Sequence, residues 1–299
     1  MLFRSARIVR GYTFISRHYQ DGDRIVILGF SRGAYTARAL AGMISDVGLL
    51  DPQAMGEPVS DEDGGSAKEH AYRMGVSAWL RYRDHAKARQ HNPGVLQRLA
   101  DLVSSLPLVA KTAPLPPRMV HAPIYAVAVW DTVGALGIPN MGETAKEADA
   151  FRFANDQLSA NVAYGLHAVS FDEQRASFAP TLWQADGRIQ QVWFGGAHAD
   201  VGGGYPERES GLSNIALKWM LDELAQRGLP FKPWPTAWQL NTYQDGHEPW
   251  KHGVFKAVPP AQRDWGGYAV NEHTTLQQRL TWILAGRPTP DPAEGSAMA

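Results

Sequence analysis

Residues 25–34 read IVILGFSRGA, an apolar run that ends in the pattern G-x-S-x-G. The run has the composition of a buried strand, and the residues after it have the spacing of a helix. A strand, a sharp turn that exposes a serine, and a helix together form the context of a nucleophile elbow. Gly29 and Gly33 are expected to keep side chains out of this tight turn. We therefore interpret Ser31 as a candidate nucleophile; the alternative is an ordinary Gly-Ser turn.

Strand and helix patterns alternate on both sides of this motif, which predicts an α/β fold with a mainly parallel sheet flanked by helices. The expected strands are residues 24–30, 124–130 and 189–194. The expected helices are residues 3–19, 32 to about 46, 155–170 and 212 to about 228. In such sheets the chemistry lies at the carboxyl ends of the strands.

The chain is expected to divide into a domain of residues 1–230 and a shorter extension. Residues 51–117 are expected to be a helical insert, suited to a lid over a pocket or, alternatively, to helices with a solvated face. Residues 231–286 are rich in Trp and Pro without clear periodicity, which predicts an irregular extension packed on the domain. Residues 287–299 have the composition of a disordered tail.

Three polar residues each follow the end of an expected strand, namely Ser31, Asp131 and His198. A serine hydroxyl needs a base within hydrogen-bond reach, and the base needs an acid that holds its tautomer. The order Ser, Asp, His along the chain suits these roles. The backbone N–H of Arg32, directly after the serine, is the expected donor to an oxyanion. Alternatively, Asp131 is an ordinary turn residue and His198 an ordinary loop residue, each bonded to nearby backbone and without a catalytic role.

The sequence also allows a second acid–base pair. Asp200 lies two residues after His198 and could act with His273 as the base. The spacing His198-x-Asp200 also fits two metal ligands, but no third candidate ligand follows at a sequence spacing typical of a metal site. We therefore expect no metal and no cofactor.

Composition excludes several classes of protein. The 299-residue chain has a net charge of −1, so no nucleic-acid partner is expected. It contains no cysteine, which excludes disulfides, cysteine-based zinc sites and a thiol nucleophile. No apolar stretch of signal-peptide type follows the basic residues 1–10, and no stretch has the length of a membrane span. A cytoplasmic location in the producing cell is the expectation.

Several motifs in order resemble one family. They are GFSRGAYTARALAGMI (29–44), VWDTVGALG (129–137), DEQR (172–175) with Trp183, VWFGGAHADVGGGY (192–205) and LSNIALKWM (212–220). Together they resemble the α/β-hydrolase domain of type VI secretion phospholipase effectors of the first lipase class, and related bacterial and fungal proteins of unassigned function. The resemblance covers about residues 8–225 and aligns the family's nucleophile, acid and base with Ser31, Asp131 and His198.

The resemblance implies a serine esterase of phospholipase type, a bacterial toxin that acts on phospholipid or another acyl ester at a membrane surface. It further implies a secretion-system component and an immunity protein as partners, and delivery by type VI secretion to the periplasm of a target cell. Two alternatives remain open. One is a non-catalytic remnant of the same fold, and the other is a soluble esterase or thioesterase without a membrane role.

The sequence departs from the family pattern at its beginning. Members of the family usually start this domain with a strand that leads into an Asp-Gly-Thr motif, and residues 1–24 contain no such motif. The expectation is a sheet that lacks its first strands and one oxyanion donor, with weak activity and a tendency to self-associate.

Overall fold

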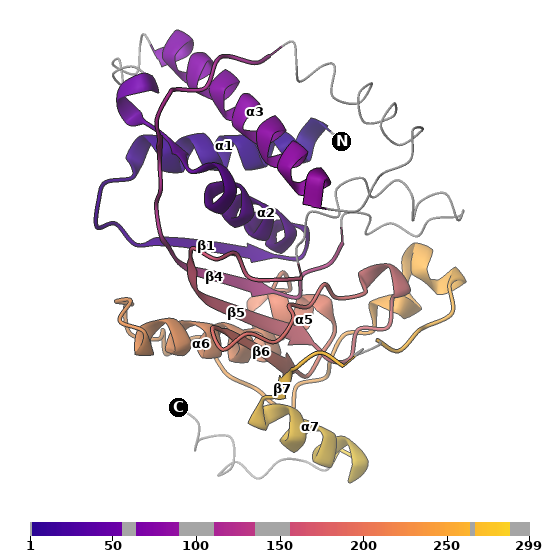
Figure 1. Ribbon diagram of the computed structural model, residues 1–299. Helices are drawn as coiled ribbons and strands as arrows, with labels where there is room; N and C mark the ends of the chain where they lie inside the picture. Colours follow the sequence, from indigo (N-terminus) through magenta and orange to yellow (C-terminus); the bar gives the residue numbers. More distant parts are fainter. Residues whose placement is uncertain (1, 56–63, 90–110, 135–155, 264–266, 288–299) are drawn as a thin grey trace.

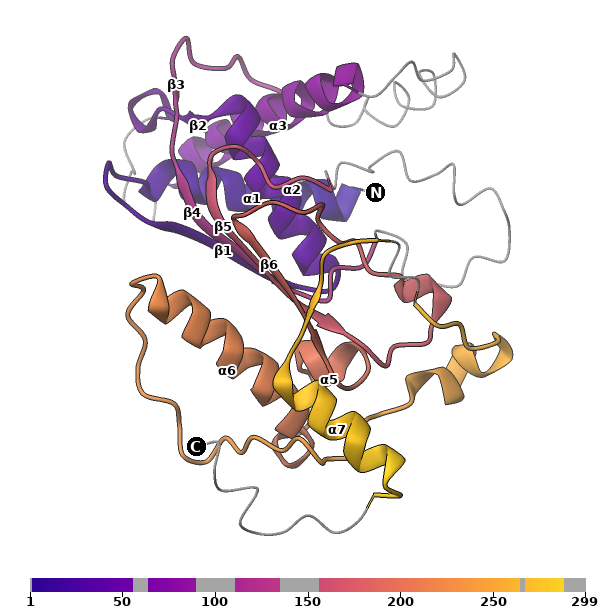
Figure 2. The same ribbon diagram turned by 60° about the horizontal axis from the view of Figure 1, so that its bottom comes forward.

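A computed structural model describes residues 2–55, 64–89, 111–134, 156–263 and 267–287 (Figure 1). Residues 56–63 and 90–110 of the predicted insert, and the predicted tail beyond Arg287, lie outside these residues. The described chain forms one central sheet with helices on both faces (Figures 1 and 2).

The sheet has five parallel strands in the order β1-β4-β5-β6-β7, which confirms the predicted α/β class. The strands are β1 (Ile25–Phe30), β4 (Ile124–Trp130), β5 (Val162–Ser170), β6 (Ile189–Phe194) and β7 (Asn271–Glu272). A separate antiparallel pair joins β2 (Leu49–Leu50) to β3 (Met119–Val120). Three of the strands were expected from their apolar runs, and β5 and β7 were not.

The prediction of a helix over residues 155–170 is wrong, because β5 is a strand at the centre of the sheet. Its last six residues are buried, so both faces of the strand are covered. A strand that is buried on both faces has no alternation of apolar and polar residues. Periodicity alone cannot separate such a segment from a buried helix.

The helices form layers on the two faces of the sheet. They are α1 (Leu2–His18), α2 (Arg32–Val47), α3 (Gly64–Arg89), α5 (His198–Gly202), α6 (Gly211–Gln226) and α7 (Thr274–Leu284). Short 3-10 turns occupy Pro52–Met55, Ala176–Phe178, Glu207–Glu209, Pro249–Lys251 and Gly253–Ala257. Figures 1 and 2 show α1–α3 on one face, α5 and α6 on the other, and α7 beside β7.

Strand β4 shows how one sequence serves both layers. Val127 and Val129 belong to the core under α1–α3, while Ala126 and Ala128 belong to the core under α6. Successive side chains of a strand point to opposite faces, so this alternation divides the interior in two. Small residues at the second pair of positions leave room for the larger side chains of α6 and β6.

Helix α3 is part of the main core. Met74, Val76 and Trp79 are buried in the cluster that also holds α1 and α2. Its partner helix α2 lies directly on β1 and β4, and Gly42 of α2 lets the Tyr82 ring come close. The interpretation of the insert as a lid therefore does not apply to residues 64–89, which support the helix that carries the elbow.

Strand register brings the expected site residues to one edge of the sheet. Phe30 pairs with Trp130, and Trp130 pairs with Ala168 in the next strand. Ser31 and Asp131 follow the first two of these residues directly. They therefore leave neighbouring parallel strands at the same level.

Trp79→Ala is expected to lower the free energy of unfolding by about 3–5 kcal/mol, because it leaves a large cavity between α3 and the rest of the core. The control His70→Ala, at an exposed position of the same helix, should change it by less than about 0.5 kcal/mol. Urea unfolding measures both values. Similar small effects for the two variants would contradict the placement of α3 in the core.

Candidate active site

The nucleophile elbow is visible in the backbone. Ser31 has φ of 59°, a left-handed conformation that costs energy for a residue with a Cβ. It lies between β1 and α2, and its N–H donates to the Trp130 carbonyl at 3.0 Å. Asp131 also has a positive φ, 36°, and its N–H donates to the Ala168 carbonyl at 2.7 Å. Both residues are thus held by the strand ladder one position beyond their strands.

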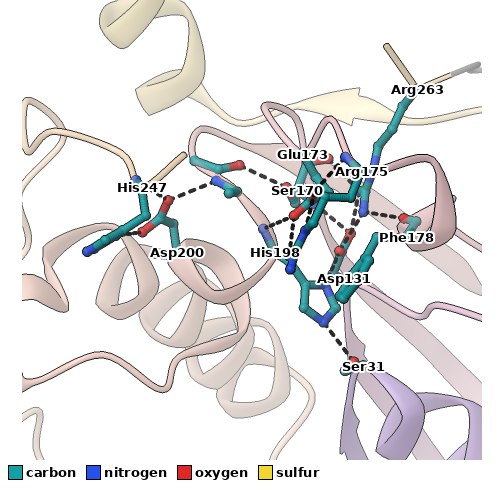
Figure 3. Close-up of polar contacts among 12 residues, drawn as sticks. Ser31, Asp131, Ser170, Glu173, Arg175, Phe178, His198, Asp200, His247 and Arg263 are labelled. Carbon is teal, nitrogen blue, oxygen red and sulfur yellow. Dashed lines mark hydrogen bonds and ion pairs between the residues drawn. The ribbon is translucent and has the colours of Figure 1, made fainter. Parts of the chain in front are cut away.

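Ser31, His198 and Asp131 form a continuous chain of hydrogen bonds (Figure 3). Ser31 Oγ lies 2.7 Å from His198 Nε2, and His198 Nδ1 lies 2.5 Å from Asp131 Oδ2. Both contacts are satisfied when Nδ1–H donates to the carboxylate and Nε2 accepts from the hydroxyl. The histidine is 6% exposed and the aspartate is fully buried. The geometry is that of a nucleophile, a base and an orienting acid.

Asp131 has a second partner besides His198, a cation from the C-terminal extension. Arg263 donates from Nη1 to Oδ1 at 2.6 Å and from Nη2 to Oδ2 at 2.7 Å, and the backbone N–H of Ser170 donates to Oδ1 at 2.9 Å. Burial alone would raise the pKa of Asp131. The charge and hydrogen bonds of Arg263, with those of His198, instead hold that pKa well below its usual range. The carboxylate therefore stays ionised.

The loop before His198 is fixed through its backbone. The N–H of Gly196 donates to Asp172 at 2.6 Å, that of Ala197 to Asp200 at 2.9 Å, and that of His198 to Glu173 at 3.2 Å. Three consecutive amides are thus each bound by a carboxylate. This arrangement fixes the position from which the imidazole leaves the chain.

Glu173 is itself neutralised by Arg175, which forms a fork of two bonds at 2.7 and 2.8 Å. Burial opposes ionisation of Glu173, but the hydrogen bonds and charge of Arg175 lower the pKa of that carboxyl below its ordinary value. The guanidinium lies 3.6 Å from the ring centre of Phe178, and that ring meets the His198 ring edge-on at 4.8 Å. The DEQR segment therefore supports His198 directly, through the bond from its amide to Glu173, and indirectly, through the contact of Arg175 with the Phe178 ring.

An open cavity of about 420 Å³ lies next to the elbow. It is lined mainly by apolar side chains at the ends of β1, β4, α5 and α6, including Phe30, Trp130 and Leu217. The Phe30 ring also packs on the His198 ring, with centres 4.6 Å apart. Phe30 thus contacts both this space and His198, while Ser31, His198 and Asp131 are not among the residues that line it.

The alternative pair Asp200 and His273 is not brought together. Asp200 Oδ1 instead bonds His247 Nδ1 at 2.6 Å, and the His247 ring stacks on Tyr205. His273 is the N-cap of α7, where Nδ1 lies 2.7 Å from the hydroxyl of Thr275. Both residues have structural partners of their own. Within the described ranges, no group of three or more His, Asp or Glu side chains is arranged to hold a metal ion.

Arg263 was not predicted from the sequence. It stands in a Trp-rich segment without periodicity, 132 residues after its partner. For Asp172, Glu173 and Arg175 the sequence suggested an ion network without a catalytic role; Glu173 and Arg175 do form an ion pair, and the bond from the His198 amide to Glu173 was not foreseen. An unpaired buried carboxylate would be costly, so a search for a cation to neutralise Asp131 is the physical argument that would have led to Arg263.

The two glycines of the elbow differ. A Cβ at Gly29 would lie 2.5 Å from the Gly33 carbonyl oxygen, whereas a Cβ at Gly33 would meet no described atom within 4 Å. The expected steric role thus holds at Gly29 alone. We expect Gly29→Ala to destabilise the fold by about 1–3 kcal/mol or more, since backbone must move. Gly33→Ala should leave stability unchanged or slightly raised, because alanine favours a helix.

Thermal and urea unfolding of these two variants checks the prediction. Two equally destabilised variants would mean that the close packing of strand, turn and helix is not as described.

One family model and two individual proteins are similar to this chain. A family model described as "T6SS, Phospholipase effector Tle1-like, catalytic domain" matches residues 4–223. The chain is 32% identical over 171 residues to the uncharacterized protein YEL023C of Saccharomyces cerevisiae. That alignment covers 57% of this chain and 20% of the yeast protein.

A crystal structure of an uncharacterized protein from Pseudomonas aeruginosa is similar, with a TM-score of 0.36 and 18% identity. The alignment covers 77% of this chain and 36% of that one, so the chain spans a minor part of both relatives. The family match, by contrast, extends from α1 through most of α6 and includes every residue of the Ser31–His198–Asp131 chain of hydrogen bonds. The chain therefore belongs to the family of Tle1-like phospholipase effector catalytic domains of type VI secretion systems.

Proposed function

We propose that the protein is a serine hydrolase that cleaves acyl esters of phospholipids. Ser31 is the nucleophile, His198 the general base and acid, and Asp131 the group that orients the histidine. The observation that carries this proposal is the pair of contacts on the imidazole, at 2.7 Å to Ser31 and 2.5 Å to Asp131. Membership of a phospholipase effector family supports the lipid ester as substrate.

The reaction follows from the positions of the three groups. His198 Nε2 takes the hydroxyl proton as Ser31 Oγ bonds to the ester carbonyl carbon, which gives a tetrahedral oxyanion. The carbon–oxygen bond to the alcohol then breaks, and His198 returns the proton to the leaving oxygen. Water adds to the acyl-serine by the same exchange, releases the fatty acid and restores the hydroxyl. Asp131 remains ionised throughout and stabilises the imidazolium.

The oxyanion is expected to accept a hydrogen bond from the backbone N–H of Arg32. Arg32 is the first residue of α2, where amide groups have no acceptor within the helix. The partial positive charge at the helix N-terminus also favours the negative oxygen. The role rests on this position directly after the nucleophile.

The family supports a type VI secretion context and delivery to target cells. We extend this to action in the periplasm of the target and to an immunity protein in the producer. No helix in the described part of the chain combines the length and the apolarity needed to cross a bilayer.

Ser31→Ala is expected to abolish labelling by a fluorophosphonate and to lower kcat by about 10⁶-fold, if the three residues act as a unit. The wild-type chain should release fatty acid from phospholipid vesicles as well as from short soluble esters. Labelling that survives the substitution would contradict the role of Ser31. Hydrolysis of soluble esters alone would favour the esterase alternative, and no labelling of the wild type would favour the non-catalytic one.

His198→Ala and Asp131→Asn are each expected to reduce kcat by about 10⁴-fold or more, since the base or its orientation is lost. The matched controls Asp200→Asn and His273→Ala should retain at least about a tenth of the activity, because their side chains bond other partners. Steady-state kinetics on a soluble ester measures all four. The reverse pattern would assign the reaction to Asp200 and His273.

A further inference from the structure

Arg263 occupies an unusual place for a cation, because it binds the carboxylate that orients the base. Its side chain is 2% exposed, and it forms the two bonds to Asp131 described above. The same guanidinium donates to the carbonyls of Ser170 and Phe178, each at 2.7 Å. Arg263 therefore ties the ends of β4 and β5 and the turn after β5 to one point in the C-terminal extension (Figure 3).

Several ionisable groups lie on this side of His198. Asp131 is paired with Arg263, and the neighbouring His167 is neutral, because burial lowers its pKa to about 3. Arg38 is a further buried cation, and its charge acts on His167. Nε2 of His167 accepts from the N–H of Thr132, which agrees with a neutral ring. Ser31, which also contacts the imidazole, is uncharged.

The carboxylates on the loop side of His198 also have bonded or nearby partners. Glu173 is bound by Arg175 in a fork. Asp172 lies 3.9 Å from Arg279, and Asp200 is bonded to His247.

We propose that Arg263 is a positioning residue that fixes Asp131 and offsets its charge, so that the reaction keeps its rate at mildly acidic pH. The inference rests on the proposed function and assigns part of the site to the C-terminal extension, outside the matched residues 4–223. Without the cation the Asp131 carboxylate is easier to protonate, because burial raises the pKa of this carboxyl and Arg263 is the main partner that lowers it. Protonation of Asp131 removes the active form as the pH falls.

The test uses the full chain, a soluble ester such as p-nitrophenyl butyrate, and the ratio of kcat/KM at pH 5.5 to that at pH 8.0. We expect Arg263→Gln to lower this ratio about tenfold, because the buried Asp131 carboxylate without its cation takes up a proton before pH 5.5 is reached. Arg263→Lys keeps the charge but not the fork, so its ratio should match the wild type while kcat falls and KM stays. The matched control Arg188→Gln removes an Arg–Asp pair at the opposite end of β6 and should change neither quantity.

Circular dichroism and thermal unfolding show whether each variant is folded. A folded Arg263→Gln variant that loses rate equally at both pH values overturns the proposal, because a merely structural role predicts that result. If this variant does not fold, Arg263→Lys decides: a changed pH ratio, or a raised KM with unchanged kcat, overturns it. A wild-type chain whose hydrolysis equals that of Ser31→Ala overturns the proposed function and this inference together. Ser31-dependent activity with an unchanged ratio in Arg263→Gln overturns this inference alone.

Discussion

The fully buried carboxylate of Asp131 is the constraint on which the rest of the site depends. A charge removed from water must be compensated by close partners, or the protein loses several kcal/mol. Here the compensation comes from three parts of the chain: the amide of Ser170 at the end of β5, the fork of Arg263 in the C-terminal extension, and the ring of His198 at the start of α5. The need to satisfy one aspartate thus explains why a segment without regular structure packs against the carboxyl edge of the sheet.

The register of the parallel strands brings the other residues of the site to the same edge of the sheet. Ser31 and Asp131 are a hundred positions apart, yet they follow residues that pair across β1 and β4. β6 delivers His198 to the same edge four residues after it ends, and the three carboxylate-bound amides fix the turn between. The positive φ values of Ser31 and Asp131 are the local cost of turning both side chains toward the histidine.

The sequence was sufficient where local rules decide the outcome. β1, β4 and β6 are apolar runs bounded by turn residues, and α2 ends at Gly48 with positive φ, as expected for a helix C-terminus. The order of Ser31, Asp131 and His198 along the chain, combined with the strand-end rule, predicted which side chains meet. β5 was missed because burial on both faces removes its pattern. Arg263 and the partner of Asp200 were missed because long-range pairing leaves no local pattern.

The charged side chains of the site and the backbone dipoles at the start of α2 have different effects. Asp131, Glu173 and Asp172 lie beside Arg263, Arg175 and Arg279, and Asp200 is bonded to His247, so these carboxylates hold the geometry of the loop and the imidazole. The amide groups at the start of α2 are different, because a helix N-terminus carries a partial positive charge that points toward Ser31. Fixed dipoles that face a developing charge cost no reorganisation during the reaction. In the reaction proposed here, the elbow therefore supplies both the nucleophile and the field that favours its tetrahedral product, while the carboxylates and their partners keep the base aligned.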